Sequence, residues 1–267
     1  MTGTETTLET RTGEGHQTWT MRFPPVNAIS PEFLDALEHN LDTALADESV
    51  SVVVLTSGLR VFSAGADASW IGEVVKAHGS AHLLQQFKAT MDRFRELCLR
   101  MRRSDLLFVA ALNGHTLAGG LELAAACDLR FAADSDRLQI GASEMKLFGV
   151  LPSGGGGTQY LTRLAGPGRM LDFVLEAEPC GSRRALELGL VERLYPAEDL
   201  LEETESFAAR IAKRAGRIGV NAAKRGILDA ATLPLYEALE FDRAVHWDAM
   251  RRGGFLPGID AFVERFG

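Results

Sequence analysis

Two glutamates, Glu122 and Glu144, lie near glycine-rich segments where their carboxyl groups could take part in chemistry. Glu122 follows Gly119 by three residues, and Glu144 ends the segment Gly141-Ala-Ser-Glu144. Two carboxyl groups in different environments can act as general acid and general base, because one holds a proton while the other accepts one. Each glutamate also has a simpler interpretation, Glu122 as a partner of a helix dipole and Glu144 as an ordinary surface carboxylate.

The chain has 27 glycines, and several of them gather in three loops at residues 62–67, 113–120 and 152–158. The first two loops follow buried strands, where α/β proteins commonly build their sites. Small residues let a ligand atom approach backbone N–H groups, so two such loops can hold one oxygen in an oxyanion hole. The second loop leads into a helix, whose positive end would support Gly119 or Gly120 in that role. Ordinary turns remain the alternative.

The phosphate-binding patterns G-x-G-x-x-G after the first strand and G-x-x-x-x-G-K-[ST] are both missing from the sequence. The four glycines 154–157 resemble a phosphate loop only superficially, because no lysine follows them.

Apolar periodicity predicts the elements that must position these loops. Strands are expected at residues 8–12, 16–23, 51–56, 106–112, 129–133 and 138–140. Helices are expected at residues 31–46, 80–103 and 121–126. Ser30 and Pro31 have the types that favour an N-cap and a first helical position. The strand–helix–strand order over residues 16–56 indicates a βαβ unit with a right-handed crossover.

Beyond residue 158 the pattern becomes almost entirely helical. Helices are expected near residues 159–165, 167–176, 182–188, 199–214, 216–231, 234–251 and 258–265. The sequence therefore predicts an α/β core of repeated β-β-α units over residues 1–195 and a helical C-terminal region over residues 196–267. Leu235, Leu239, Phe241, Val245 and Trp247 give that region an apolar face that needs a partner.

Composition narrows the class of protein. Of 267 residues, 46% are hydrophobic and 24% charged, which is typical of a globular chain and excludes a disordered one. The net charge of −8 disfavours nucleic acid and anionic membranes as partners. Cys98, Cys127 and Cys180 have neither metal-binding spacing nor an even count, so no metal site and a reducing compartment are expected. Without a signal-peptide pattern or a long apolar run, a cytoplasmic protein is predicted.

Taken together, the motifs resemble those of the enoyl-CoA hydratase/isomerase family, also called the crotonase superfamily. The resemblance rests on residues 26–30, 62–67, 113–124 with Cys127-Asp128, and 152–159, and more weakly on residues 185–191 and 258–262. These segments occur in the family's order and span nearly the whole chain. The resemblance implies a crotonase-like spiral of β-β-α units with a helical C-terminal region.

The resemblance also assigns roles to residues. It implies an oxyanion hole formed by the backbone N–H groups of Ala66 and Gly119, and catalysis by Glu122 and Glu144. Residues implied to contact the substrate or its coenzyme A (CoA) portion are Ala28, Ala64, Gly65, Asp67 and Gly120. A hydratase of this family adds water across the C2=C3 bond of a 2-enoyl-CoA in acyl-CoA metabolism. CoA then belongs to the substrate, and no tightly bound cofactor is expected.

This sequence departs from the family in the second acidic segment. The family's Gly-Gln-Pro-Glu is Gly141-Ala-Ser-Glu144 here, and the segment from Asp128 to Pro152 is longer than usual. If Glu144 is displaced, the protein could instead be an isomerase, an acyl-CoA hydrolase or a decarboxylase. Ser143 and His115 are either extra polar groups of the site or ordinary turn and loop residues.

Three other assignments stay open at this point. Trp70 either lines an acyl pocket or anchors a helix. Arg102-Arg103 and Lys213-Arg214 are expected at solvated helix ends, with CoA phosphates as the alternative partner. The resemblance implies a homotrimer or a dimer of trimers held together by the C-terminal helices. A non-catalytic RNA-binding protein, which also occurs in this family, is disfavoured by the acidic charge.

Overall fold

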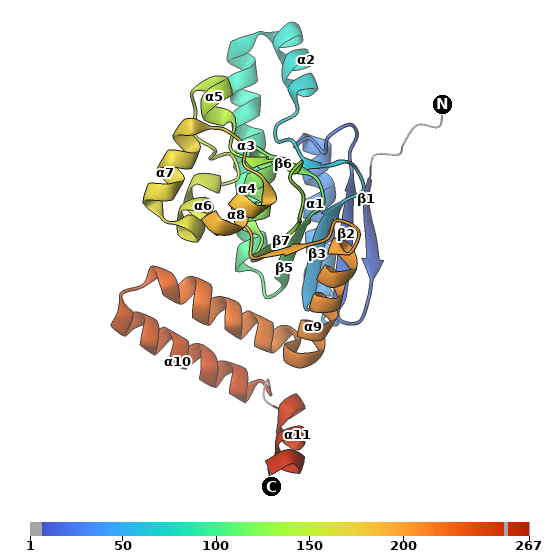
Figure 1. The fold of residues 1–267 in the computed structure, drawn as a ribbon, viewed down its shortest axis with the longest axis vertical. Coiled ribbons are helices and arrows are strands. Elements are labelled where there is room, and N and C mark those ends of the chain that lie inside the picture. The colour runs from blue at the N-terminus through green and yellow to red at the C-terminus, as the bar shows by residue number, and fades with distance from the viewer. Residues whose placement is uncertain (1–6, 254–255, 267) are drawn as a thin grey trace.

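The computed structural model describes residues 7–253 and 256–266 and has two sheets surrounded by helices (Figure 1). Residues 1–6 of the expected polar N-terminus lie outside the described part. The strands are β1 Thr7–Thr12, β2 His16–Arg22, β3 Val52–Ser57, β4 Val61–Ser63, β5 Leu107–Leu112, β6 His115–Leu117, β7 Leu129–Ala133, β8 Ile140–Gly141 and β9 Arg193–Tyr195. None of the described helices has the length and apolar character needed to cross a bilayer.

Helices surround the sheets and continue into the C-terminal region. Those before the last described strand are α1 Pro31–Ala46, α2 Ala68–His78, α3 Ser80–Arg103, α4 Gly119–Ala126, α5 Glu144–Phe148, α6 Gly157–Ala165, α7 Pro167–Glu176 and α8 Ser182–Leu188. The C-terminal elements are α9 Leu200–Lys224, the π-helix η1 Arg225–Asp229, the 3-10 helix η2 Ala230–Thr232, α10 Leu235–Arg251 and α11 Leu256–Phe266.

The larger sheet has the order β1-β2-β3-β5-β7-β9. β1 and β2 form the expected antiparallel hairpin, and the remaining neighbours pair in parallel. All six residues of β3 are buried, which explains its continuous apolar sequence, because helices cover both faces of a central parallel strand. The α/β fold class predicted from the sequence is therefore confirmed.

The β2–α1–β3 unit illustrates how sequence directs this fold. Ser30 caps α1, since its hydroxyl accepts a hydrogen bond from the Phe33 N–H at 3.2 Å, and Pro31 occupies the first turn. The buried face of α1 consists of Phe33, Leu34, Leu37, Leu41 and Ala44. This face packs on the sheet with helical spacing, as predicted.

A second, smaller sheet has the order β4-β6-β8, and all its pairs are parallel. The sequence pattern predicts residues 62–63 and 115–117 within glycine loops, but the structure shows them in β4 and β6. These strands have only three residues each, too few to show an alternating pattern. The last strand of this sheet covers residues 140–141 rather than the expected 138–140.

Three further differences from the sequence prediction concern α2, α5 and β9. α2 follows the first loop, although no separate helix was expected there. Glu144 is the first residue of the short helix α5, an element that the sequence pattern did not predict. β9 also extends the sheet just before the region expected to be helical. From residue 200 onward the described elements are helical, as predicted.

The C-terminal region begins on the larger sheet. Leu200, Phe207 and Ala208 of α9 share a buried apolar cluster with Val54 and Phe131 of the sheet. Gly216 interrupts α9 with non-helical backbone angles, at the break expected between residues 214 and 216. In Figure 1 the distal half of α9 turns away from the sheet and runs alongside α10. The division of the chain at residue 195 remains a prediction.

Candidate active site

The N-terminus of α4 is positioned by an unusual backbone conformation. Ala118 precedes the helix with φ 50° and ψ −127°, values that are uncommon for a residue with a side chain. Gly120 packs so closely on β4 that an added Cβ would overlap the Ser63 carbonyl oxygen. The first N–H groups of α4 lack helical acceptors by geometry, so Gly119 presents its N–H at the positive end of the helix.

The first glycine loop meets this helix end. Ile29 pairs with Ala66 in an isolated bridge, and the Ile29 N–H donates to the Gly65 carbonyl at 2.8 Å. Gly65 has φ +90°, and a Cβ there would lie 2.9 Å from the Gly119 nitrogen. Within the described part of the chain, neither the Ala66 N–H nor the Gly119 N–H donates to an acceptor. Two unengaged donors from separate loops therefore lie close together.

Glu122 lies one turn into α4 and is 3% exposed. Its Oε2 accepts hydrogen bonds from the Gly155 N–H at 2.9 Å and the Gly157 N–H at 2.8 Å. A Cβ on Gly157 would lie 2.5 Å from the Glu122 Cγ, so the glycine permits this approach. The third glycine loop therefore binds a carboxylate of its own chain, a contact that no short sequence pattern predicts.

Glu144 interacts electrostatically with Glu122. Burial raises its pKa to about 7, its own backbone N–H lowers that value, and the charge of Glu122 raises it further. Its Oε2 is buried and has no hydrogen-bond partner. Burial also raises the pKa of Glu122, while the N–H groups of Gly157 and Gly155 lower it. The pKa of Glu144 therefore responds to the charge of Glu122 despite the longer segment before Pro152.

Of the residues expected to contact CoA, Ala64, Gly65 and Asp67 lie in the first glycine loop, and Ala28 lies in the segment before α1. Ala28 and Ala64 are half-buried, and the Ala64 N–H donates to the Val26 carbonyl at 3.1 Å. The Asp67 carboxylate caps α2 by accepting from the N–H groups of Ser69 and Trp70 at 2.8 and 3.0 Å. This carboxylate is thus engaged in the fold, whereas the neighbouring backbone lines the loop.

Asn27 is a site-forming residue whose role is not evident from the sequence. It is fully buried with φ 49°, a conformation that asparagine tolerates better than most residues. Its Oδ1 accepts from the Phe23 N–H at 2.7 Å, and its Nδ2 donates to Ser57 Oγ at 2.7 Å and the Phe62 carbonyl at 2.9 Å. Asn27 thereby fixes the loop before α1 against β4.

The remaining sequence candidates have local contacts. His115 lies in β6, and its Nδ1 accepts from the Gln139 N–H at 3.2 Å. Ser143 precedes α5 without a side-chain capping hydrogen bond. The Trp70 ring stacks on Phe87 at 6.5 Å between centroids, which joins α2 to α3 and favours the helix-anchor interpretation.

The Arg102 guanidinium lies 5.4 Å from the centre of the Tyr160 ring. A cation in this position gains from the ring quadrupole without any anionic ligand.

The geometry suits chemistry on a carbonyl compound. A carbonyl oxygen between the Ala66 and Gly119 N–H groups would gain stabilisation as negative charge develops on it. Two carboxyl groups, one with a pKa near neutrality, can then move protons nearby. Across the described residues, His, Cys, Asp and Glu side chains form no group of three suited to hold a metal.

Comparison with known proteins agrees with this arrangement. The sequence profile of the family described as enoyl-CoA hydratase/isomerase matches residues 13–267. A probable enoyl-CoA hydratase of Bacillus subtilis is 32% identical over 248 residues, covering 92% of this chain and 91% of the relative. The crystal structure of an enoyl-CoA hydratase from Bacillus anthracis has a TM-score of 0.87 at 28% identity, covering 97% of this chain and 96% of that one.

Some relatives are much longer. The glyoxysomal fatty acid beta-oxidation multifunctional protein MFP-a of Brassica napus is 34% identical over 209 residues, which cover 78% of this chain. The matched part is 27% of that relative's length.

The fold and site define an α/β protein with two unengaged backbone donors beside a pair of interacting carboxyl groups. The chain belongs to the enoyl-CoA hydratase/isomerase (crotonase) family.

Proposed function

We propose that this protein is an enoyl-CoA hydratase that interconverts a 2-enoyl-CoA and a 3-hydroxyacyl-CoA. The observation that carries this proposal is the coupling of Glu122 and Glu144, in which Glu144 has a pKa of about 7 and an unpartnered buried oxygen. Hydration needs one group that activates water and one that delivers a proton, and two such carboxyl groups meet that need. The reaction uses CoA only as part of the substrate.

We assign the roles as follows. The thioester oxygen accepts hydrogen bonds from the N–H groups of Ala66 and Gly119, which stabilise the enolate charge. Glu122 acts as the base, since two N–H bonds to its Oε2 favour the carboxylate. It takes one proton from water as the oxygen bonds to C3. Glu144 delivers its proton to C2, so the elements of one water molecule are added across the double bond.

Ala28, Ala64, Gly65, Asp67 and Gly120 belong to the proposed binding site for the thioester and its CoA portion. Of these, Gly65 supports the role most directly, because its backbone adjoins the Gly119 nitrogen. Isomerisation, hydrolysis and decarboxylation are the rival reactions on the same fold.

Mass spectrometry of a panel of acyl-CoA thioesters separates these reactions. We expect 2-enoyl-CoA substrates to gain the mass of one water without release of free CoA. An unchanged mass with a shifted double bond would indicate an isomerase, free CoA a hydrolase, and loss of carbon dioxide a decarboxylase. Any of these three outcomes, without water addition, would overturn the proposed reaction.

We further propose that the chain assembles as a homotrimer or a dimer of trimers. Support comes from large apolar side chains that are more than half exposed on α10 and α11, namely Leu235, Tyr236, Leu239, Trp247, Phe262, Val263 and Phe266. Exposed apolar surface on this scale is typical of a protein–protein interface. A second apolar group, Leu147, Phe148, Val150, Leu151, Leu171 and Leu175, lies on α5, α7 and the loop after α5.

A further inference from the structure

The C-terminal elements after Gly216 form an arm, defined here as residues 217–251. Gly216 has φ 55° and ψ −174°, so it separates the arm from the proximal half of α9. That proximal half is anchored by apolar side chains such as Phe207 and Ala208, which pack on the sheet. In Figure 1 the distal half of α9 and α10 run together below the core. The arm is therefore attached through a break in the helix.

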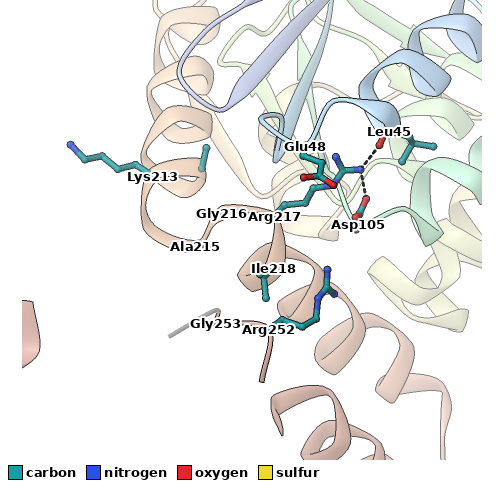
Figure 2. A pocket seen from close by; sticks show the side chains of 11 residues that line it. Leu45, Glu48, Asp105, Lys213, Ala215, Gly216, Arg217, Ile218, Arg252 and Gly253 are labelled. Carbon is teal, nitrogen blue, oxygen red and sulfur yellow. Dashed lines mark hydrogen bonds and ion pairs between the residues drawn. The ribbon is translucent and has the colours of Figure 1, made fainter. Parts of the chain in front are cut away.

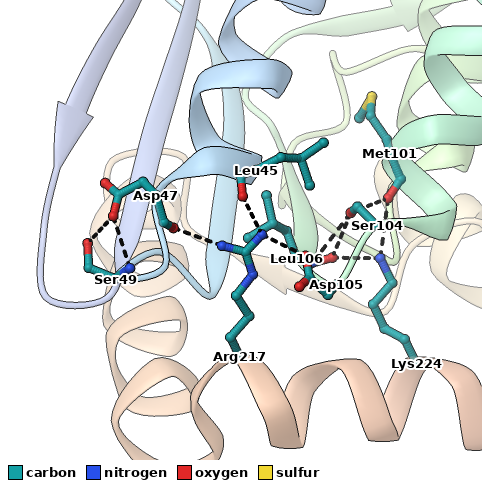
Figure 3. Close-up of polar contacts among 9 residues, drawn as sticks. All are labelled: Leu45, Asp47, Ser49, Met101, Ser104, Asp105, Leu106, Arg217 and Lys224. Atoms are coloured by element: carbon teal, nitrogen blue, oxygen red, sulfur yellow. Dashed lines mark hydrogen bonds and ion pairs between the residues drawn. The ribbon is translucent and has the colours of Figure 1, made fainter.

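Arg217, the first residue of the arm, contacts the end of α1. Its guanidinium donates to the carbonyl oxygens of Leu45 at 2.9 Å and Asp47 at 2.8 Å (Figure 3). It also pairs with the Asp105 carboxylate at 2.7 Å. α1 has no basic residue in its own last turn, so Arg217 supplies the cation that the helix C-terminus favours.

Lys224 makes a second attachment, close to the end of α3. Its ammonium donates to the carbonyl oxygens of Leu106 at 2.6 Å and Met101 at 3.3 Å, and pairs with Asp128 at 3.0 Å. Lys224 is 6% exposed. A buried ammonium is tolerated only when its charge and hydrogen bonds are satisfied, which fixes Lys224 at this position. Figure 3 shows both cations extending from the same helix toward these carbonyl groups.

The arm has little apolar anchorage of its own. Its buried residues within the described part of the chain are Val220, Lys224, Ala230 and Val245. Beside Gly216 lies a hollow of about 610 Å³ whose lining includes Glu48, Lys213 and Arg252 (Figure 2). The break in α9 thus faces open space on one side, so close packing does not hold it. Polar contacts therefore carry a large share of the attachment of the arm to the core of its own chain.

We propose that Arg217 and Lys224 form a two-point latch that fixes the arm against the C-terminal ends of α1 and α3, with Gly216 as its hinge. Releasing the latch frees the arm while the sheet and the proximal half of α9 stay folded. The inference is independent of the reaction proposed above, because it concerns only how the arm is held.

Hydrogen exchange of the full-length protein, followed by mass spectrometry, tests the latch. Arg217→Gln removes one point and leaves the half-buried Asp105 accessible to water. The double variant Lys224→Met, Asp128→Asn removes the second point without leaving a buried unpaired charge. Lys213→Gln is the matched control, since Lys213 is exposed and its side chain extends away from Arg217 in Figure 2.

We expect amides of residues 217–232 to exchange about fivefold faster or more in both latch variants, with β2 and β3 unchanged. An arm that exchanges at the wild-type rate in either variant would overturn the two-point latch. An equal acceleration in the sheet would also overturn it, since the arm would then open only with global unfolding. So would an equal effect of Lys213→Gln, because the two cations would then have no specific role.

Discussion

At the scale of single residues, the environment of Glu144 keeps its carboxyl group protonated up to a pKa of about 7. Its carboxyl group is largely removed from water and faces the charge of Glu122, and both effects favour the protonated form. Glu122 differs because two backbone N–H groups stabilise its carboxylate. The two glutamates thus have unequal surroundings, which suits a division into proton donor and base.

This asymmetry predicts a pH dependence. Glu144 holds its proton below a pKa of about 7 and loses it above that value. If it is the proton donor in hydration, kcat/KM should fall tenfold per pH unit on the alkaline side of about pH 7. Steady-state hydration of crotonyl-CoA between pH 5 and 10 measures this profile. A rate that keeps rising through pH 8 would contradict the assigned role of Glu144.

Thermal denaturation provides an independent check of the raised pKa of Glu144. Because the raised pKa means that the folded state binds the proton more tightly than the unfolded chain, stability is lost as pH rises through about 7. Glu144→Gln should therefore raise Tm relative to wild type at about pH 8 but not at about pH 4. The same Tm difference at both pH values would show that Glu144 titrates normally.

At the scale of elements, the glycine loop before α6 positions the base. Gly155 and Gly157 lie more than thirty residues from Glu122 in sequence, yet their N–H groups hold its Oε2. α4 supplies Glu122 and Gly119 from one helix, so the carboxylate and the oxyanion donor move together. The site is therefore built by packing α4 between the first and third glycine loops.

Gly157→Ala tests this positioning. The new Cβ would lie 2.5 Å from Glu122 Cγ and 3.0 Å from its Oε2, so the carboxylate must shift. We expect kcat to fall by about a hundredfold, since small displacements of a catalytic group have effects of this size. Gly168→Ala is the control, because nothing lies within 4 Å of its added Cβ. Equal kcat values for the two variants in the hydration assay would contradict the role of the loop.

The elements also show which features the sequence can predict. Helices with long apolar faces, such as α1 and α3, occur where periodicity places them, and α1 also has a capping serine. β4 and β6 are too short to produce a period and depend on their partners in the smaller sheet. α2 had a usable signal, since Asp67 is a favoured N-cap and apolar residues recur at helical spacing after it.

The candidate site likewise has some features that the sequence can predict and others that it cannot. The motifs placed Gly119 and Glu122 together because they share one helix turn, where spacing determines proximity. The approach of Glu144 to Glu122 and the N–H donors from Gly155 and Gly157 depend on tertiary packing, which local patterns do not encode. The network of Asn27 likewise joins three separate segments.

At the scale of the whole molecule, exposed apolar side chains gather in two places, one on α10 and α11 and the other on α5, α7 and the loop after α5. Leu239 and Trp247 of α10 are more than half exposed, and a charged residue there would oppose burial in an interface. The proposed latch and the proposed assembly both involve α10, because Arg217 and Lys224 would fix the position of the arm that contains this helix.

Light scattering at micromolar concentration tests the assembly. We expect a mass of about three or six times that of the single chain for the wild type. Leu239→Asp should shift the population toward monomer, whereas Arg243→Gln, at an exposed polar position on the same helix, should not. A wild-type monomer at this concentration would contradict the proposed oligomer.

Glutamine variants of Glu122 and Glu144 test directly whether the two residues together hydrate a CoA thioester. Each substitution keeps the side-chain size but removes the ability to exchange the catalytic proton. We predict that Glu122→Gln and Glu144→Gln each lower kcat for crotonyl-CoA hydration by roughly a hundred- to ten-thousandfold while circular dichroism shows an unchanged fold. Hydration at the wild-type rate by both variants would contradict the proposed roles of Glu122 and Glu144.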